Sequence, residues 1–542
     1  MSGCFILLLH AHLPYVRHPE HEYSLEELWL FEAVRETYIP LINILECMVN
    51  DRISPRLTLS MSPTLMEMLN DELLRSRFVR YMDNLIELSE HERMRTRKSP
   101  FEPVAVLYNG KFKEARRLYL ERYRQDLISP FRRLQDEGHI EITATSATHA
   151  FLPAFAHCPE TVKRQIEVGI RSYIRNFGKP PAGFWLPECG YFNGLDSFLK
   201  DARIKYFFLE SHGLLHGKPG PRSGIYRPVL SPSGLAVFGR DFKSSRQVWC
   251  ASSGYPGDPF YRDFYRDIGF DLPPDYTGKF TRLNEIKSFT GMKYYRITGK
   301  SEEKSPYDRA MAMGRVSGHA AHFIQGRRSD LDRLSEFISC PVVFSAFDAE
   351  LFGHWWFEGT DWLDAVLRSM PADKSFNITT PGAYLSTHFK KGVPGPPVRL
   401  APSSWGEGGY SAVWIGKRNH YLYRHLHRTA ERMAEMLKGK CRGAAGLKAD
   451  TRIRRVVNQA ERELLLAQAS DWFFLMEKGR AAEYAESRVK GHIDNFNLLF
   501  SMLKGDNRAD ERLKVMEDKN RAFAWLDAVK DYCSLPSDNK SS

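Results

Sequence analysis

The stretch CFILLLHAHLPY (residues 4–15) places six apolar residues directly before a His-x-His pair. The apolar run at 4–9 is continuous rather than alternating, which predicts a strand buried on both faces of a parallel sheet. It has no basic leader and no cleavage site, and it is too short for a signal-peptide core or a membrane span. Residues 4–9 therefore predict a buried strand with His10 and His12 at its carboxyl end.

Strands of this kind recur along the first two-thirds of the chain, with helices between several of them. Ser24 and Glu27 form a predicted capping box, and the helix that opens at Pro159 is expected to stop at Gly178. This strand–helix alternation predicts an α/β fold, either a parallel barrel or a doubly wound sheet. The further predicted strands are 56–60, 139–144, 183–186, 204–209, 235–239 and 341–346.

Three segments depart from that alternation. Residues 64–137 read as a charged helical insertion, and residues 280–335 are poorly periodic, with a loop at 301–308. The Pro- and Gly-rich stretch 390–410 marks a domain boundary. Beyond it, an all-α domain is predicted from helices at 416–437, 447–478, 480–503 and 509–531.

Length and composition limit the classes of function. With 542 residues, the chain should form two or more domains. The net charge of +11 is spread among acidic residues, which favours a solvated surface over a nucleic-acid patch. The eight cysteines are scattered without a C-x-x-C pair, which indicates reduced thiols and a cytoplasmic location.

Residues able to do chemistry follow the predicted strands with a constant phase. In a parallel barrel the carboxyl ends of the strands form one rim, and active sites are built on that rim. Polar side chains that are scattered for structural reasons would not be expected to keep this phase. The residues in question are His10, His12, His149, Glu188, His212 and Asp348.

Two of these residues are carboxylates in strongly apolar surroundings. Glu188 lies in GFWLPECGY (183–191), and Asp348 lies in FSAFDAELFGHWWFEG (344–359) beside Glu350 and Glu358. The structural alternative is a buried salt bridge or a capped helix start, and Glu350 and Glu358 are equally consistent with structural roles. Glycosidic bond cleavage needs one ionised carboxylate and one that holds a proton, which calls for apolar neighbours.

The His-x-His pair has a second interpretation. After a strand, His10 and His12 could ligate zinc, with His149 as a third ligand. The simpler interpretation is that they bind sugar hydroxyls or hold a carboxylate.

Two later motifs complete the set. SSWGEGGYSAVW (403–414) contains Trp405 and Trp414 in a glycine-rich segment typical of a binding loop. QASDWFFLM (468–476) contains Asp471, and by itself it reads as an amphipathic helix.

Taken together, the motifs HAHLPY, TATSATHAFLP (143–153), GFWLPECGY, FSAFDAELFGHWWFEG and SSWGEGGY with QASDWFF resemble, in this order, the conserved regions of glycoside hydrolase family 57. Within it they most resemble the 1,4-α-glucan branching enzymes. The resemblance implies a distorted (β/α)7 barrel at 1–395, a helical insertion at about 64–137, and a helical domain at 396–542 that completes the cleft.

The resemblance also implies site residues. It makes Glu188 the nucleophile and Asp348 the general acid/base of a retaining mechanism, without metal or other cofactor. The loop 254–270 resembles a mobile loop over the active site, with a functional Tyr at Tyr255 or a close neighbour. At 290–296, where the family has a further aromatic, the chain has Tyr294 and Tyr295 but no Trp. The sugar-contacting residues are His12, His149, Trp405, Trp414 and Asp471, and we expect His10, Trp185, His212 and His354 to join them.

The expected reaction is transfer of an α-1,4-glucan chain to a 6-hydroxyl group, which makes an α-1,6 branch. The alternatives are an α-amylase or 4-α-glucanotransferase of the same family, a metal-dependent polysaccharide deacetylase-like hydrolase, and a non-catalytic glucan-binding protein. The expected partner is an α-glucan such as amylose or glycogen, with no nucleic acid and no membrane, and the chain is expected to be a monomer or small homo-oligomer.

Overall fold

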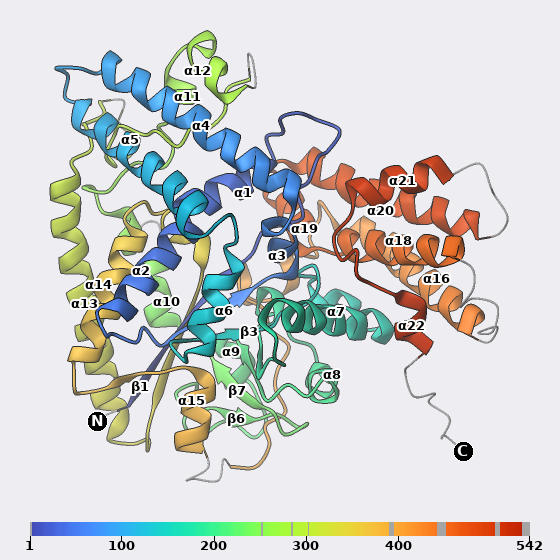
Figure 1. Cartoon of the computed structure of the whole chain (residues 1–542). Helices are drawn as coiled ribbons and strands as arrows, with labels where there is room; N and C mark the ends of the chain where they lie inside the picture. The colour runs from blue at the N-terminus through green and yellow to red at the C-terminus, as the bar shows by residue number, and fades with distance from the viewer. Residues whose placement is uncertain are drawn as a thin grey trace.

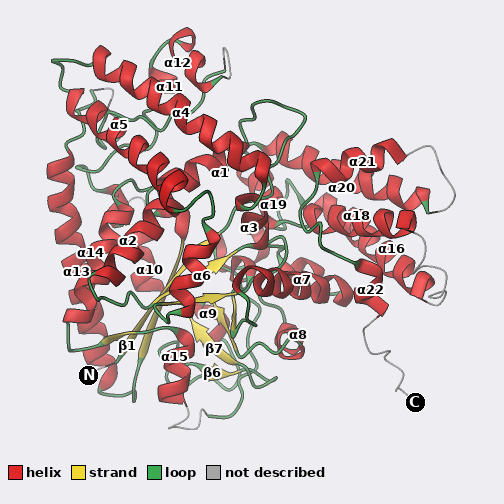
Figure 2. Cartoon of the chain, viewed as in Figure 1, coloured by secondary structure: helices red, strands yellow, loops and turns green. Residues whose placement is uncertain are grey.

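The strands of the computed structural model form a distorted barrel (Figures 1 and 2). The model describes residues 3–250, 253–282, 286–301, 303–389, 395–441, 451–503 and 510–533. All seven predicted strands are present and their pairing is parallel. They are β1 (Cys4–Ala11), β2 (Leu57–Met61), β3 (Ile140–Thr143), β4 (Gly183–Phe184), β5 (Tyr206–Leu209), β7 (Ala236–Gly239) and β8 (Val342–Asp348).

The barrel consists of two arcs joined at two seams. One arc runs β3-β2-β1-β8 and the other β4-β5-β7. Ala144 and Phe184 form a parallel bridge between the arcs. At the other seam Asp241 N donates to Phe344 O at 2.7 Å. Two short strands flank the arcs: β6 (Val229–Leu230) is antiparallel to β7, and β9 (Asn377–Ile378) is parallel to β1.

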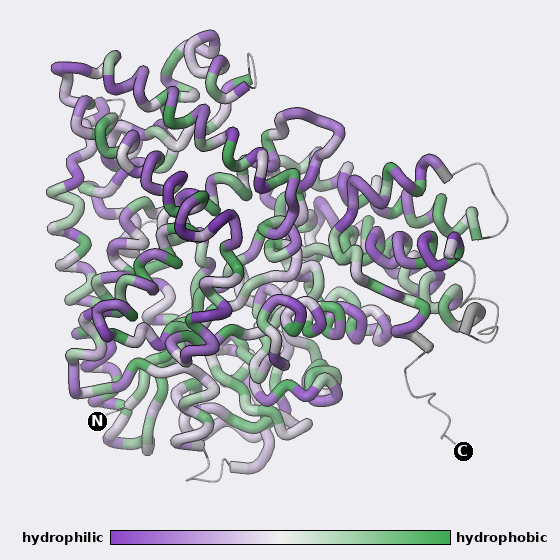
Figure 3. The backbone as a smooth tube through the Cα atoms, viewed as in Figure 1, coloured by the Kyte–Doolittle hydropathy of each residue, from purple (hydrophilic) through white to green (hydrophobic). Residues whose placement is uncertain are grey.

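Alternate residues of β1 separate two packing layers. Phe5, Leu7 and Leu9 pack in the main core with the surrounding helices. Ile6 and Leu8 belong to a second cluster, which fills the barrel with aromatic side chains such as Phe208 and Phe344. Figure 3 shows the hydrophobic residues of the strands gathered in the lower part of the molecule. Because side chains alternate along a strand, His10 continues the inner row of Ile6 and Leu8 to the barrel mouth.

Helices surround the barrel and fill the predicted insertion. The insertion forms α3 (Pro63–Leu69), α4 (Glu72–Arg95), α5 (Glu102–Arg117) and α6 (Ile128–Asp136), as predicted. The helix predicted from Pro159 is α7 (Pro159–Phe177), which ends at Gly178 with φ +74°. The remaining barrel helices are α1 (Glu27–Ala33), α2 (Ile39–Asn50), α8 (Leu195–Asp201), α9 (Ser211–Leu215), α10 (Phe242–Trp249), α11 (Ile268–Asp271), α12 (Pro274–Thr281), α13 (Arg309–Ser335), α14 (Gly359–Ser369) and α15 (Pro381–Tyr384).

The predicted capping box at Ser24 and Glu27 was wrong. Helix α1 has no side-chain cap, and Ser24 Oγ donates to Glu26 instead. The Glu27 carboxylate is buried, where it accepts hydrogen bonds from His18 N and Arg77 Nη1 at 2.9 and 2.7 Å. The charged guanidinium of Arg77 outcompetes the backbone amide of the helix start for this carboxylate.

The segment 280–335 contains more structure than its weak periodicity suggested. After the predicted loop at 301–308, whose residue 302 lies outside the described residues, Asp308 caps the 27-residue helix α13. Its buried stripe includes alanines and the paired Arg327 and Asp330, which bond at 2.7 Å. Small and charged residues on the buried face remove the hydrophobic contrast from which a helix is read.

The C-terminal part is helical, as predicted, but the predicted helices 447–478 and 509–531 are each divided in two. The described part of the first forms α18 (Thr451–Ala467) and α19 (Ser470–Lys478), separated by extended backbone at Ala469. This break lies against the barrel, where Ala469 bridges Ala150. The other helices are α16 (Tyr423–Cys441), α20 (Ala482–Met502), α21 (Asp510–Lys519) and α22 (Ala528–Cys533).

Parts of three predictions cannot be compared with the structure. Residues 390–394 of the predicted boundary, 447–450 of the second predicted helix and 509 of the last one lie outside the described residues. Within the described ranges, no helix combines the length and the apolar character needed to span a bilayer.

Gly169 of α7 tests how closely this helix must approach the barrel. A Cβ atom at Gly169 would lie 2.0 Å from Thr145 O, a backbone atom on the segment between β3 and His149. We expect Gly169→Ala to lower the free energy of unfolding by roughly 1–3 kcal/mol through overpacking. Differential scanning calorimetry would measure this as a lower melting temperature.

The matched control is Gly314→Ala in α13, where an added Cβ meets nothing within 4 Å. This change should stabilise the protein by roughly 0.5–1 kcal/mol, because alanine favours a helix interior over glycine. Equal melting temperatures for the two variants would contradict the close approach of α7.

Candidate active site

The barrel mouth brings together residues from both ends of the chain. His10 and Asp348 are register partners on β1 and β8, so they lie side by side at the carboxyl ends of neighbouring strands. Asp348 continues the inner row of Phe344 and Ala346, as His10 does on β1. Both side chains therefore reach the same end of the barrel interior.

Glu188 lies in the loop after β4, in a strained backbone conformation. Its φ is +61° and that of Cys189 is +51°, which are costly for residues with a side chain. The carboxylate accepts hydrogen bonds from Trp405 Nε1 at 2.6 Å and from Ser470 Oγ at 2.8 Å. Burial raises the pKa of Glu188 to about 7, although the hydrogen bonds from Trp405 and Ser470 lower it.

His10 is connected to Glu188 by hydrogen bonds through two side chains, His149 and Ser470. His10 Nε2 lies 2.8 Å from His149 Nε2, and His149 Nδ1 lies 2.9 Å from Ser470 Oγ. Ser470 has one proton and gives it to Glu188, so His149 Nδ1–H must donate to Ser470 and His10 Nε2–H to His149. Burial lowers the pKa of both imidazoles well below the usual value, which fits their neutral forms in this chain.

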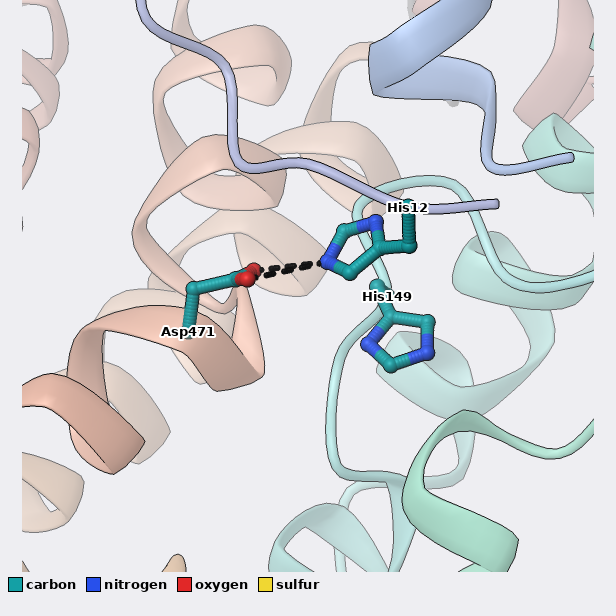
Figure 4. A group of neighbouring side chains, drawn as sticks. All are labelled: His12, His149 and Asp471. Carbon is teal, nitrogen blue, oxygen red and sulfur yellow. Dashed lines mark hydrogen bonds and ion pairs between the residues drawn. The ribbon is translucent and has the colours of Figure 1, made fainter. Parts of the chain in front are cut away.

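The pKa of His12 is shifted in the opposite direction to those of His10 and His149. Its Nε2 lies 2.9 and 3.0 Å from the two oxygens of Asp471, in the first turn of α19 (Figure 4). Burial lowers the pKa of His12, but the Asp471 carboxylate outweighs this effect with help from Glu188, and the pKa is raised. The stacked His149 ring, with its centroid 3.9 Å from that of His12, stays neutral. The site thus contains a neutral and a readily protonated imidazole in contact.

Asp348 has a higher pKa than Glu188. Burial, and then the charges of Glu350 and Glu188, raise the pKa of Asp348 to about 8. Glu350 is itself fixed by hydrogen bonds from His12 N at 3.1 Å and from the Tyr38 hydroxyl. Because the Glu188 charge adds to the proton affinity of Asp348, the two carboxyl groups titrate as a coupled pair.

Two tryptophans enclose the carboxylates. Trp185 is fully buried in the barrel interior, stacks on His10 and meets Trp405 edge to face at 5.3 Å. Trp405 also donates its backbone N–H to Glu188 O at 2.8 Å. Trp414 instead lies behind this layer, buried and stacked on Phe151 at 5.0 Å.

Three predicted site residues make their contacts elsewhere. Tyr255 donates to or accepts from His322 of α13 at 2.8 Å and stacks on His319, so it is packed under its loop rather than exposed at a lid. His354 pairs with Glu36. His212 bonds Gly409 O at 2.5 Å, which connects it to the loop that carries Trp405.

The sequence reasoning missed Ser470, Tyr38 and Arg240. Ser470 precedes Asp471 in QASDWFF, and its only sequence signal was the helix start there. The guanidinium of Arg240, which follows β7, lies over the Trp405 ring. Arg240 occupied the same phase after a strand as the predicted residues, so the rim rule could have found it.

One group has the composition of a cation site. One ligand atom each from His12, His149 and Asp471 lies within 4.8 Å of the others. In this structure these atoms are hydrogen-bonded, His12 to Asp471 and His149 to His10. A cation would have to replace those bonds, so the donor set fits a metal less well than it fits a hydrogen-bonded pair.

The arrangement suits acid–base and nucleophilic chemistry on a bond that lies between two carboxyl groups. Glu188 ionises first and has two fixed donors, while Asp348 keeps its proton to higher pH. A carboxylate beside a carboxylic acid, enclosed by aromatic rings, is what glycoside cleavage requires.

Comparison with known proteins agrees with this chemistry. Residues 6–397 match the family model described as glycosyl hydrolase family 57, and residues 425–530 match the C-terminal domain of 1,4-alpha-glucan branching enzymes. The chain is 31% identical to the 1,4-alpha-glucan branching enzyme of Thermococcus kodakarensis, over 93% of this chain and 74% of that one.

Two solved structures resemble the whole chain. The α-amylase AmyC of Thermotoga maritima superposes with a TM-score of 0.90 at 39% identity, covering 99% of this chain and 100% of that one. The GH57-type branching enzyme of Pyrococcus horikoshii superposes with a TM-score of 0.86 at 32% identity, covering 99% and 98%.

Ser470 provides a test of the proton arrangement. Ser470→Ala removes a donor that stabilises the ionised form of Glu188, so we expect the pKa of Glu188 to rise above about 7. Infrared difference titration of the carboxyl bands would measure this, with Glu188→Gln identifying the Glu188 band.

The control for this titration is Ser501→Ala in α20, whose hydroxyl donates to Leu498 O and has no connection with the site. If Ser470→Ala leaves the Glu188 band where Ser501→Ala leaves it, the hydrogen bond does not set this pKa.

Proposed function

Because the chain belongs to glycosyl hydrolase family 57, and its residues 425–530 match the C-terminal domain of branching enzymes, we propose that it is a 1,4-α-glucan branching enzyme. It cleaves an α-1,4 linkage and transfers the released chain to a 6-hydroxyl group. The observation that carries this proposal is the pair Glu188 and Asp348, two coupled carboxyl groups of different proton affinity at the barrel mouth.

In the first half-reaction Glu188 is the nucleophile and Asp348 the general acid. Asp348 gives its proton to the glycosidic oxygen while Glu188 attacks the anomeric carbon. The bond from that carbon to the leaving oxygen breaks, and a glycosyl-enzyme ester forms on Glu188. The donors Trp405 and Ser470 favour the ionised form of Glu188 that this attack needs.

In the second half-reaction Asp348 acts as general base. It removes the proton of an acceptor 6-hydroxyl group, whose oxygen attacks the anomeric carbon, so that the bond from this carbon to the Glu188 oxygen breaks and the carboxylate is released. The product has an α-1,6 branch, and the double displacement retains the anomeric configuration. Water in place of the acceptor gives hydrolysis, so transfer depends on enclosure by Trp185, Trp405 and the helical domain.

The other polar residues of the mouth are proposed to bind sugar hydroxyls. His12 and Asp471 present a charged pair, and His10 and His149 a neutral one, beside the two carboxyl groups. Trp414 supports this layer from behind through Phe151. Because His212 holds the backbone of the Trp405 loop, we assign it to the same subsite indirectly.

Tyr265 replaces Tyr255 as the proposed tyrosine of the loop 254–270. Its side chain is 69% exposed, whereas Tyr255 is buried against α13. The neighbouring Phe264 stacks on Trp355 at 4.6 Å and meets His354, in the segment that follows Asp348. This is the part of the loop nearest the rim.

Further aspects of the proposal concern organisation. Residues 1–395 would be the catalytic domain and 396–542 the domain that completes the cleft. The substrate would be an α-glucan such as amylose or glycogen, acted on by a monomer or small homo-oligomer without a cofactor. The six cysteines whose side chains the structure describes form no disulfide with one another, which agrees with the proposed cytoplasmic location.

An α-amylase is the second candidate function. It is favoured by the 39% identity to an α-amylase over nearly the full length of both chains. The two reactions share the glycosyl-enzyme and differ in whether water or a 6-hydroxyl group attacks it.

Product analysis distinguishes the two candidates. With amylose as substrate, we expect iodine staining to fall with few new reducing ends, and short chains to appear only after treatment with an α-1,6-specific debranching enzyme. Reducing ends that rise in step with the loss of colour would establish an amylase. Glu188→Gln should lose at least roughly 10⁴-fold in rate for either reaction, and retained activity would contradict its role as nucleophile.

The two pKa values also predict a narrow pH optimum. Glu188 must be ionised, so activity falls as the pH drops below about 7. Asp348 must be protonated, so activity falls as the pH rises above about 8. A bell-shaped profile of kcat/KM with its maximum between these values is expected; a rate independent of pH from 5 to 9 would contradict the assignment.

A further inference from the structure

Arg240 lies at the barrel seam between β7 and β8, against the Trp405 ring. It follows β7, and its Nε donates to Ala346 O of β8 at 3.1 Å. Its Nη1 bonds the Glu210 carboxylate at 2.9 Å, and both side chains are nearly buried, at 12% and 8% exposure. The guanidinium is thus fixed on two sides by partners from β8 and from the end of β5.

The free face of this guanidinium is covered by Trp405. The Arg240 Cζ atom lies 5.4 Å from the centroid of the indole ring, within the range of a cation–π contact. Trp405 needs such support, because the only regular structure directly after it is a distorted 3₁₀ turn at Glu407–Gly409, and Gly406, Gly408 and Gly409 all have positive φ. The opposite contact of the ring is the edge of Trp185.

Glu210 is built to hold Arg240. One of its oxygens accepts the Ser211 N–H at 3.0 Å at the start of α9, and the other accepts from Arg240. The carboxylate is therefore anchored to backbone as well as to the guanidinium, and together with the bond to Ala346 O this anchoring restricts the Arg240 side chain.

We propose that Arg240, held by Glu210, is a positioning residue that serves both catalytic carboxyl groups: it fixes the Trp405 indole whose N–H binds Glu188, and it keeps a positive charge beside Asp348. The proposal rests on the function proposed above. The Arg240 guanidinium bonds Ala346 O and Glu210 rather than either catalytic carboxyl group, so its effect passes through Trp405 in one case and through space in the other.

The charges that face the two carboxyl groups define what Arg240 adds. Asp471 and His12 act on Glu188, and His149 lies 3.6 Å from it. Asp348 is subject to two negative charges, Glu350 and Glu188, and to two positive ones, Arg240 and His12. Arg240 lowers the pKa of Asp348, and the Trp405 hydrogen bond lowers that of Glu188.

The test separates the two effects by changing the charge and the planar group independently. Arg240→Met removes the charge, so both limbs of the pH profile of kcat should move to higher pH, with a fall in kcat of roughly 10- to 100-fold and little change in KM. Arg240→Lys keeps the charge but not the planar face or the fork, so only the acid limb should move. Glu210→Gln should move both limbs in the direction of Arg240→Met, but less far.

The matched control is Arg17→Met, which breaks the buried ion pair of Arg17 with Asp71 (2.9 Å). The ion-pair partners of Arg17 are Asp71 and Asp518, neither of which belongs to the barrel mouth. Arg17→Met should lower the melting temperature and leave both limbs in place. If Arg240→Met and Glu210→Gln do the same, Arg240 is only a strut of the barrel seam and the proposal is overturned.

Infrared titration of the Glu188 and Asp348 carboxyl bands, without substrate, provides the second measurement. Both bands should titrate at higher pH in Arg240→Met, and unshifted bands would overturn the proposal. The infrared titration needs no reaction, so it decides the role of Arg240 even if the wild-type protein proves inactive on amylose. Such inactivity would refute the proposed function only.

Discussion

The burial of one carboxylate at the mouth of the barrel is the constraint on which the rest of the site depends. A buried carboxylate is costly unless donors satisfy it. Glu188 receives its hydrogen bonds from Trp405 and Ser470, which lie 217 and 282 residues further along the chain. The barrel therefore does not complete its own site. The break between α18 and α19 and the glycine-rich loop around Trp405 are where the C-terminal part bends to supply these donors.

The same burial separates the three imidazoles of the site, those of His10, His149 and His12, into neutral rings and one that is readily protonated. The chain from His10 through His149 to Ser470 ends on the Glu188 carboxylate, so His149 is neutral with a defined tautomer and His10 donates from Nε2. Burial favours the neutral form of His10. His12 is one ring away but faces Asp471, which favours its charged form. Because the neighbouring imidazoles differ in protonation, the site offers sugar hydroxyl groups both hydrogen-bond donors and acceptors within a few ångström.

Backbone strain is also present at the site. Glu188, Cys189 and His149 all have positive φ, and each such residue costs about 1–3 kcal/mol. The packing that sustains this cost is close by: the barrel is filled with aromatic rings up to Trp185, and α7 approaches the segment before His149 so closely that only Gly169 fits. The rigid interior thus holds the reacting groups in positions that an isolated loop would not adopt.

The sequence by itself determined the order of the seven strands, the helical insertion, the helical C-terminal part and the rim that carries His10, Glu188 and Asp348, because continuous apolar runs and the polar residues that follow them are local features. It could not determine that Ser470 belongs to the site, or what Arg240 contacts there, since the partners of both residues lie far away in the chain. It left the lid tyrosine open between Tyr255 and its close neighbours, and it placed Glu27 in a capping box, where the local motif was overruled by Arg77. Proton affinities, too, were decided only in the tertiary structure, because they depend on which charges burial brings within a few ångström of one another.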